Sequence, residues 1–123
     1  MIKRVIIAGC RNYTNYEQAK EYIDFCISNI RQKYELIFVS GGCTGADAIG
    51  ERYAKENGFK LEVYPAKWKK YGKAAGPKRN AEMVKIGDYF ICFWDNKSAG
   101  TKSLIILARK ANKKIAIKQI QAV

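Results

Sequence analysis

Three glycines closely follow one predicted strand and form a loop that can hold a phosphate group. The apolar run Leu36–Val39 leads into Ser40 and then Gly41-Gly42-Cys43-Thr44-Gly45, and a helical pattern begins at Ala46-Asp47. Glycine adopts positive φ without strain, and the first turn of a helix presents free N–H groups to an anion. The loop lacks both Gly-x-Gly-x-x-Gly and the Gly-Lys-Ser/Thr of a P-loop, so neither a dinucleotide fingerprint nor a Walker-type nucleoside triphosphatase is indicated.

The side chains of this loop suit a ribose phosphate. The Thr44 hydroxyl can donate a hydrogen bond to a phosphate oxygen. Asp47 can accept from ribose hydroxyls, or it can serve only as an acidic residue that complements the helix dipole. Gly100-Thr101, at the start of a later helix, is either a second anion cradle or a simple tight turn.

Polar, charged and aromatic side chains also follow the other predicted strands. Arg11 offers a planar guanidinium to a phosphate or a flat face to a base. Arg79 and Asn80 can close over an anion, or they can form a salt bridge and a surface amide. Trp68 and Tyr71 can stack on a base or pack a subunit interface. The candidate ligand-binding residues are Gly9, Cys10, Arg11, Gly41, Gly42, Cys43, Thr44, Gly45, Asp47, Trp68, Arg79, Asn80, Asp95, Ser98, Gly100 and Thr101.

The four cysteines lie far apart, and the chain has no histidine. The paired spacing of a zinc site is missing, so we expect no metal site and mostly buried, reduced thiols. Cys10 is the one thiol that we consider as reactive, because the neighbouring Arg11 can lower its pKa.

The charge of the chain is positive and uneven. The net charge is +12, and residues 52–80 hold nine Lys and Arg against two Glu. This balance indicates an anionic partner, such as a nucleotide, a nucleic acid or a phosphorylated metabolite, or else a solvated lysine-rich surface. No apolar run is long enough to span a membrane or resembles a signal peptide, so we expect a cytoplasmic protein without membrane contact.

Alternating strand and helix patterns position these side chains. Strands are expected at Arg4–Gly9, Leu36–Val39, Leu61–Pro65, Tyr89–Trp94 and Ile115–Ile117. The first helix is expected to start at a capping box of Thr14 and Glu17 and to continue to Ile30. A second helix ends near Gly58, residues 66–75 are an irregular basic loop, Gly76-Pro77 opens a third helix, and Ser103–Ala111 is a fourth.

This order predicts one α/β domain over residues 1–123. We expect a Rossmann-like three-layer sandwich, with a five-stranded, mostly parallel sheet and helices on both faces. Ligands of such sheets bind outside the carboxyl ends of the strands, at the point where the strand order switches. Because the candidate residues cluster at these ends, the sequence predicts a binding cleft there.

The motifs, taken in order, resemble the SLOG superfamily and most closely its YspA-like branch. The superfamily is the Rossmann-like group that includes the LOG phosphoribohydrolases and the Smf/DprA proteins. The resemblance implies a pocket for a nucleotide or a nucleotide-derived ligand, such as ADP-ribose, NAD or AMP, and it implies homo-oligomers. The matching motifs are Gly9-Cys10-Arg11, Gly41 to Asp47, Pro65-Ala66-Lys67-Trp68, Gly72, Ala75 to Asn80 with Met83, Phe93-Trp94-Asp95 and Ser98 to Thr101.

One departure from the family pattern bears on catalysis. LOG enzymes carry Gly-Thr-x-x-Glu, whose glutamate is essential, whereas this chain has Leu104 at the glutamate position. Leucine is neither a general base nor an oxocarbenium stabiliser. We therefore expect a sensor or sequestering module first. A nucleotide or N-glycosidic hydrolase that uses Asp47 or Asp95, and a protein that binds single-stranded nucleic acid as Smf/DprA proteins do, are the alternatives.

Overall fold

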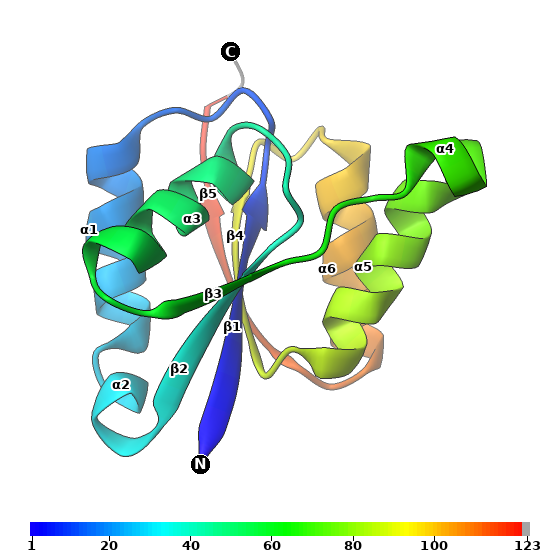
Figure 1. Ribbon diagram of the computed structural model, residues 1–123. Helices are drawn as coiled ribbons and strands as arrows, with labels where there is room; N and C mark the ends of the chain where they lie inside the picture. The colour runs from blue at the N-terminus through cyan, green and yellow to red at the C-terminus, as the bar shows by residue number, and fades with distance from the viewer. Residues whose placement is uncertain (122–123) are drawn as a thin grey trace.

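A central sheet lies between two layers of helices in the computed structural model, which describes residues 1–121 (Figure 1). Strands and helices alternate along the chain, as the sequence predicts. The elements are β1 (Ile2–Gly9), α1 (Tyr16–Ile27), α2 (Ile30–Lys33), β2 (Glu35–Ser40), α3 (Ala46–Glu56), β3 (Lys60–Val63), α4 (Trp68–Tyr71), the 3-10 helix η1 (Gly72–Ala74), α5 (Ala75–Ile86), β4 (Tyr89–Trp94), α6 (Ala99–Lys110) and β5 (Lys114–Gln119).

The five strands are all parallel and lie in the order β3-β2-β1-β4-β5. This confirms the predicted α/β class, with a sheet that is wholly rather than mostly parallel. The strand order switches between β1 and β4, where Gly9 is paired with Phe93. A crevice is therefore expected beyond the ends of these two strands.

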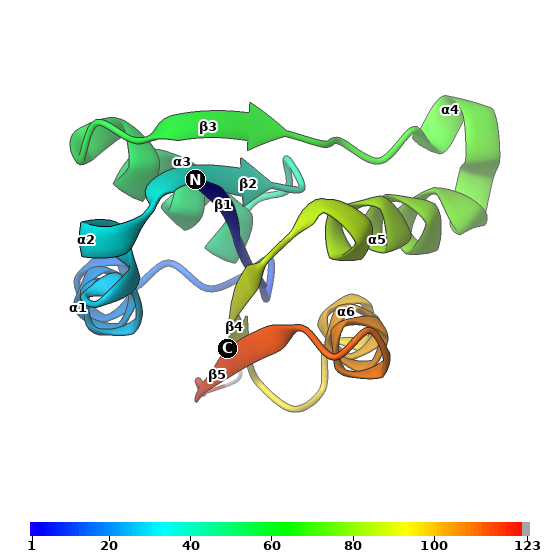
Figure 2. The same cartoon turned by 90° about the horizontal axis from the view of Figure 1, so that it is seen from below.

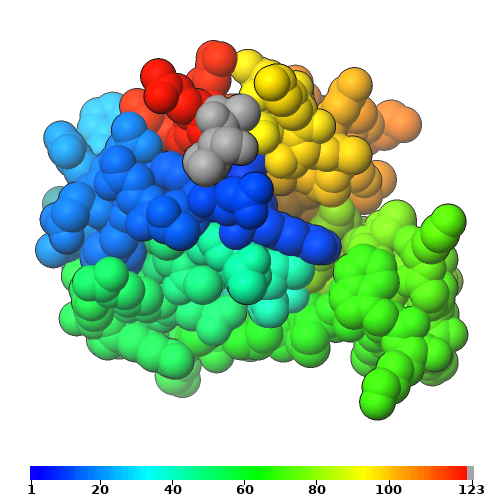
Figure 3. All heavy atoms as spheres, turned by 90° about the horizontal axis from the view of Figure 1, so that it is seen from above, coloured from blue at the N-terminus to red at the C-terminus, as the bar shows by residue number. Residues whose placement is uncertain are grey.

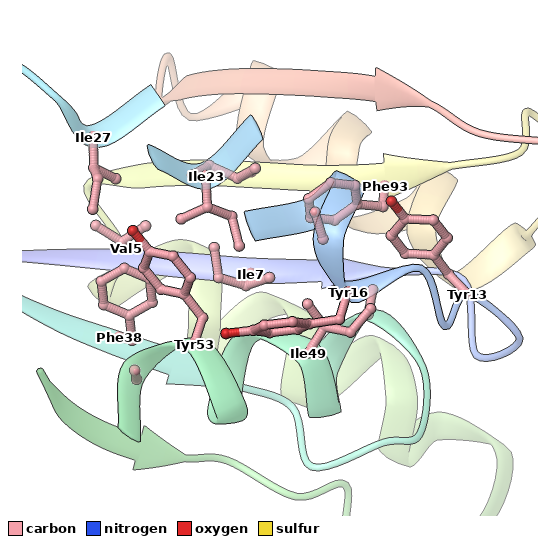
Figure 4. Close-up of a cluster of buried hydrophobic side chains, with 14 of the residues drawn as sticks. Val5, Ile7, Tyr13, Tyr16, Ile23, Ile27, Phe38, Ile49, Tyr53 and Phe93 are labelled. Carbon is pink, nitrogen blue, oxygen red and sulfur yellow. The ribbon is translucent and has the colours of Figure 1, made fainter. Parts of the chain in front are cut away.

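Alternate residues of β1 face opposite layers, because side chains alternate across a strand. Val5 and Ile7 belong to the core formed with α1 and α3, whereas Ile6 and Ala8 belong to the core formed with α5 and α6. Figure 2 shows the layers from below, and Figure 4 shows the first core at close range. Both faces of the strand are buried, which explains its continuous apolar run.

The start and end of α1 differ from the sequence prediction. Asn15 is the N-cap, and its side-chain oxygen accepts the Gln18 N–H at 3.1 Å, so the Thr14–Glu17 capping box is wrong. The helix ends at Ile27 rather than continuing to Ile30. The Ser28 hydroxyl donates to the Phe25 carbonyl at 3.0 Å, and such side-chain bonds to the backbone disfavour continuation of a helix.

Residues 66–75 are more ordered than the predicted irregular loop. The short helices α4 and η1 lead directly into α5, and Gly72 has a φ of +55° at the bend between α4 and η1. Helix α6 begins at Ala99, four residues before the expected Ser103. The prediction started too late because the first turn lines the pocket and lacks the apolar pattern of the core. Within the described residues, no helix is both long and apolar enough to cross a membrane.

Candidate functional site

A pocket of about 520 Å³ opens at the carboxyl ends of β1 and β4, where the strand order switches. Its size is in the range of ligand-binding clefts. Figure 3 looks down on this face, where the segment after β1, the start of α6 and the segment around α4 lie near one another. The candidate residues that line it are Gly9, Cys10, Arg11, Cys43, Asp47, Trp68, Arg79, Asn80, Asp95, Ser98, Gly100 and Thr101.

The remaining candidates, Gly41, Gly42, Thr44 and Gly45, are not among the lining residues. Their loop is closed largely by its own hydrogen bonds. The Gly42 N–H donates to Ser40 Oγ at 3.0 Å. The start of α3 is also covered, because the Ala46 N–H donates to the carbonyl of Cys10 at 3.1 Å. These four residues therefore lie behind the pocket lining. Their contact with a ligand remains a prediction.

Asp47 holds this loop in place. Its side chain is only 6% exposed, and Oδ2 accepts the Cys43 N–H at 3.1 Å. Burial raises the pKa of Asp47 above its ordinary value, although the Cys43 N–H and the nearby Arg79 act in the opposite direction. The carboxylate thus caps the glycine loop from within.

Arg79 and Asn80 connect two walls of the pocket. Arg79 donates from Nη1 to the carbonyl of Gly41 at 2.6 Å and from Nε to Asn80 Oδ1 at 3.1 Å. Asn80, in turn, donates from Nδ2 to the carbonyl of Gly100 at 3.2 Å. Asn80 is 6% exposed, so it is not a surface amide, and no ion pair within the described residues involves Arg79. The pair joins the loop after β2 to the start of α6 and carries a positive charge to the pocket.

The loop between β4 and α6 is fixed by Asp95 and Trp94. Asp95 Oδ1 accepts the N–H groups of Lys97 at 2.9 Å and of Ser98 at 2.8 Å. These backbone hydrogen bonds lower the pKa of Asp95 to about 2. Trp94 Nε1 donates to the carbonyl of Ser98 at 3.1 Å. Ser98, the residue that precedes α6, is therefore held in one position relative to the end of β4.

The first turn of α6 is part of the pocket lining. The Ser98 side chain makes no capping hydrogen bond, and the turn contains no acidic residue. Geometry leaves the first N–H groups of any helix without an intrahelical partner, and here Ala99, Gly100 and Thr101 all line the pocket. Thr101 is 6% exposed, and no hydrogen bond within residues 1–121 uses its hydroxyl. The positive end of the α6 dipole therefore lies at the pocket.

We predict that Asp95→Ala lowers the melting temperature at pH 7 by a few degrees, since it releases the loop before α6. The folded-state pKa of about 2 lies below the ordinary 3.8. The stabilisation by Asp95 is thus fully present above about pH 4 and is lost as the pH falls through 2. Thermal unfolding, followed by circular dichroism between pH 3 and pH 7, gives the melting temperatures of the parent protein and of Asp95→Ala. The difference between them should become smaller toward pH 3. A gap independent of pH would contradict this role.

Two cysteines, Cys10 and Cys43, line the pocket. Cys10 Sγ lies 3.1 Å from Ser98 Oγ, and burial raises the pKa of the Cys10 thiol. The lowered pKa that Arg11 suggests is therefore wrong, because Arg11 is exposed while the thiol is buried. Cys43 Sγ lies 3.9 and 4.0 Å from the two terminal nitrogens of Arg79.

The pocket also has an apolar wall, and the sequence prediction named only part of it. Leu104, which is 2% exposed, and Ile120, which is 8% exposed, both belong to it. Ile120 follows β5, whose end the sequence analysis placed too early, at Ile117. The rule that ligands bind beyond the carboxyl ends of parallel strands applies to β5 as well, and it could have located Ile120. Leu104 and Met83 were singled out only through the family motifs. The other lining residues outside the candidate set include Ala8, Asn12, Tyr13, Ser103, Ile120 and Gln121.

The fold is that of a Rossmann-like α/β protein, and its pocket lies at the strand ends. The chain belongs to the YspA, cpYpsA-related SLOG family, whose sequence model matches residues 3–71. It is also similar to the Gene 61 protein of Mycobacterium phage D29. The two are 34% identical over 116 residues, which cover 89% of this chain and 91% of the phage protein.

A solved structure of DNA processing protein A from Helicobacter pylori has a similar fold. The TM-score is 0.64 with 21% sequence identity, and the match covers 94% of this chain. That structure is described as giving insight into a single-stranded DNA binding mode. This chain spans 64% of its length, so the likeness concerns the fold that the two share.

Proposed function

We propose that the protein binds a nucleotide or a nucleotide-derived ligand, of the AMP, NAD or ADP-ribose kind, as a sensor or sequestering module. The observation that carries this proposal is the first turn of α6. Its free N–H groups and the Thr101 hydroxyl line a pocket that has an apolar wall. A nucleotide has groups that match both features, an anionic phosphate and a base with flat aromatic faces.

The pocket supports one orientation of such a ligand. The phosphate lies at Gly100 and Thr101, where the helix dipole and the N–H groups stabilise an anion. Arg11 and Arg79 also line the pocket and supply positive charge. The base lies against the apolar wall, and Trp68, which also lines the pocket, offers a surface for stacking.

Binding without hydrolysis fits these side chains better than catalysis does. Leu104 lies in the pocket wall where LOG enzymes carry their glutamate. Asp95 has a pKa of about 2, far from the range of an efficient general acid or base near neutral pH. Asp47 is nearly buried and is engaged by the Cys43 N–H. Homo-oligomeric assembly and a cytoplasmic location remain predictions.

A thermal-shift screen tests this proposal. The ligands are AMP, ADP-ribose, NAD and cyclic nucleotides, with adenosine and inorganic phosphate as the two partial ligands. A ligand at 100 times its Kd stabilises a folded protein by about 2.7 kcal/mol, which corresponds to several degrees in a domain of this size. We expect at least one complete nucleotide to exceed both partial ligands. Stabilisation by none of them would remove the proposal, and chromatographic release of a base would favour the hydrolase alternative.

A further inference from the structure

Strand β5 has a free outer edge. It is the last strand of the sheet, and within residues 1–121 no other strand pairs with that edge. Figure 2 shows it at the margin of the sheet, on the side away from α4. The N–H and C=O groups along an edge strand can pair with a further strand. β5 is six residues long, whereas β3, the strand at the opposite edge, has four. β5 is therefore the longer ladder to which another segment can add.

One face of β5 is basic. Side chains alternate along a strand, so Lys114, Ala116 and Lys118 share the face toward α1. The ring contacts agree with this placement. Lys114 Nζ lies 5.5 Å from the centre of the Tyr89 ring, and Lys118 Nζ lies 5.9 Å from the centre of the Tyr22 ring. No ion pair within the described residues uses either lysine. This face therefore carries two positive charges, one on each side of Ala116, that an acidic partner can complement.

A mostly apolar cavity of about 160 Å³ lies on the same side of the sheet. The end of α1 and the start of α2 form one side of it, through Cys26, Ile27 and Ile30. β4 and β5 form the other side, which includes Ala116. An apolar cavity of about 150 Å³ in another protein holds benzene, so this one has room for a single apolar side chain. The basic face of β5 thus has an apolar recess beside its centre.

We propose that β5 binds an extended acidic segment of another protein, which adds to the sheet as a sixth strand. Opposite residues of paired strands have Cβ atoms about 5 Å apart, so each side chain of the segment meets one of β5. Acidic side chains lie opposite Lys114 and Lys118, and an apolar side chain between them lies opposite Ala116, beside the cavity. The two remaining positions lie opposite Ile115 and Ile117, which are half-buried and pack against the core formed with α5 and α6. The resulting pattern is acidic-apolar-apolar-apolar-acidic, and it is the same in either strand direction.

Charge complementarity favours this occupant over a second copy of the chain. Two copies paired through β5 would bring Lys114 and Lys118 of both to one face of the joined sheet, where like charges repel. Lysines on an edge strand are a known means of preventing such association of identical sheets. A carboxylate opposite each lysine instead forms an ion pair across the two strands. The proposal is independent of the nucleotide pocket, because no described residue lines both cavities.

Fluorescence anisotropy with a labelled peptide that contains Glu-Val-Leu-Val-Glu tests the proposal. At low salt it should bind more tightly than two control peptides. One control has the order Val-Glu-Leu-Glu-Val, which moves both glutamates to the other face of the added strand, and the other has lysine in place of glutamate. The double variant Lys114→Glu, Lys118→Glu should weaken binding roughly tenfold or more, because two attractive cross-strand pairs become repulsive. Ala116→Leu should weaken it without a change of charge, because the larger side chain fills the cavity.

The double variant Lys69→Glu, Lys70→Glu is the matched control. It makes the same change in net charge at exposed positions on α4, which lies on the other side of the molecule (Figure 2). It should therefore weaken peptide binding less than the β5 double variant does. Thermal unfolding checks that each variant folds, and the β5 variants should keep the thermal-shift response to AMP and ADP-ribose.

Three results would overturn the proposal: no peptide binding at low salt, binding of either control peptide as tight as that of Glu-Val-Leu-Val-Glu, or equal losses in the β5 and α4 double variants. A nucleotide response without peptide binding removes the β5 proposal alone. Peptide binding without a nucleotide response removes the pocket proposal alone.

Discussion

Replacing Gly100 with aspartate is expected to abolish nucleotide binding while leaving the fold intact. A Cβ at this position meets no atom within 4 Å, so the side chain has room. An acidic residue in the first turn also stabilises a helix, and glycine is a poor helix former. The new carboxylate, however, would lie where we place the phosphate. Two like charges about 4 Å apart repel by about 4 kcal/mol near a protein surface, so affinity should fall by roughly 100-fold or more.

Gly100→Asn is the matched control for this variant. Asparagine has nearly the same shape as aspartate but no charge, so it should weaken binding much less. Isothermal titration calorimetry with AMP or ADP-ribose gives both affinities, and thermal unfolding checks that both variants fold. Equal affinity of the parent protein and Gly100→Asp for the nucleotide would place the phosphate elsewhere.

Gly45→Ala is expected to destabilise the protein severely. Gly45 has a φ of +75°, and an added Cβ would lie 2.3 Å from the Cys10 carbonyl oxygen and 2.5 Å from the Arg11 carbonyl carbon. Both contacts are with backbone, which cannot rotate away as a side chain can. The strained φ alone costs about 1–3 kcal/mol, and the clash must also separate the loop after β1 from α3. We expect a total loss of roughly 3 kcal/mol or more in the free energy of unfolding.

Gly58→Ala is a control that has a positive φ but no close backbone contact. Gly58 has a similar φ of +72°, but an added Cβ there meets nothing within 4 Å. Alanine at this position should therefore lower the free energy of unfolding only by the cost of a positive φ, about 1–2 kcal/mol. Urea unfolding of the two variants gives the comparison. If both lost the same stability, the packing of Gly45 against the segment after β1 would not be important for the fold.

The sequence predicts the architecture well because strand and helix patterns repeat without interruption. Continuous apolar runs such as Val5 to Ala8 indicate strands that are buried on both faces, and the parallel sheet follows. The strand-end rule then locates the pocket without any side-chain detail. Local boundaries such as the N-cap at Asn15 depend on single hydrogen bonds, which the pattern does not encode.

The sequence could not predict which of two helix starts, that of α3 or that of α6, is open to the pocket. The glycine loop before α3 and Gly100-Thr101 before α6 look alike as phosphate sites. In the structure, the start of α3 is covered by the carbonyl of Cys10, whereas the start of α6 lines the pocket. This difference depends on how the segment after β1 folds over the start of α3. The bridge from Arg79 through Asn80 to Gly100 is likewise a tertiary contact between distant residues.

A crystal structure of the protein soaked with AMP or ADP-ribose tests the central claim most directly. We predict phosphate oxygens within hydrogen-bond distance of the N–H groups of Gly100 and Thr101, with the base against the wall that contains Leu104. A phosphate bound at the loop before α3, or a nucleotide bound outside the pocket, would contradict this account.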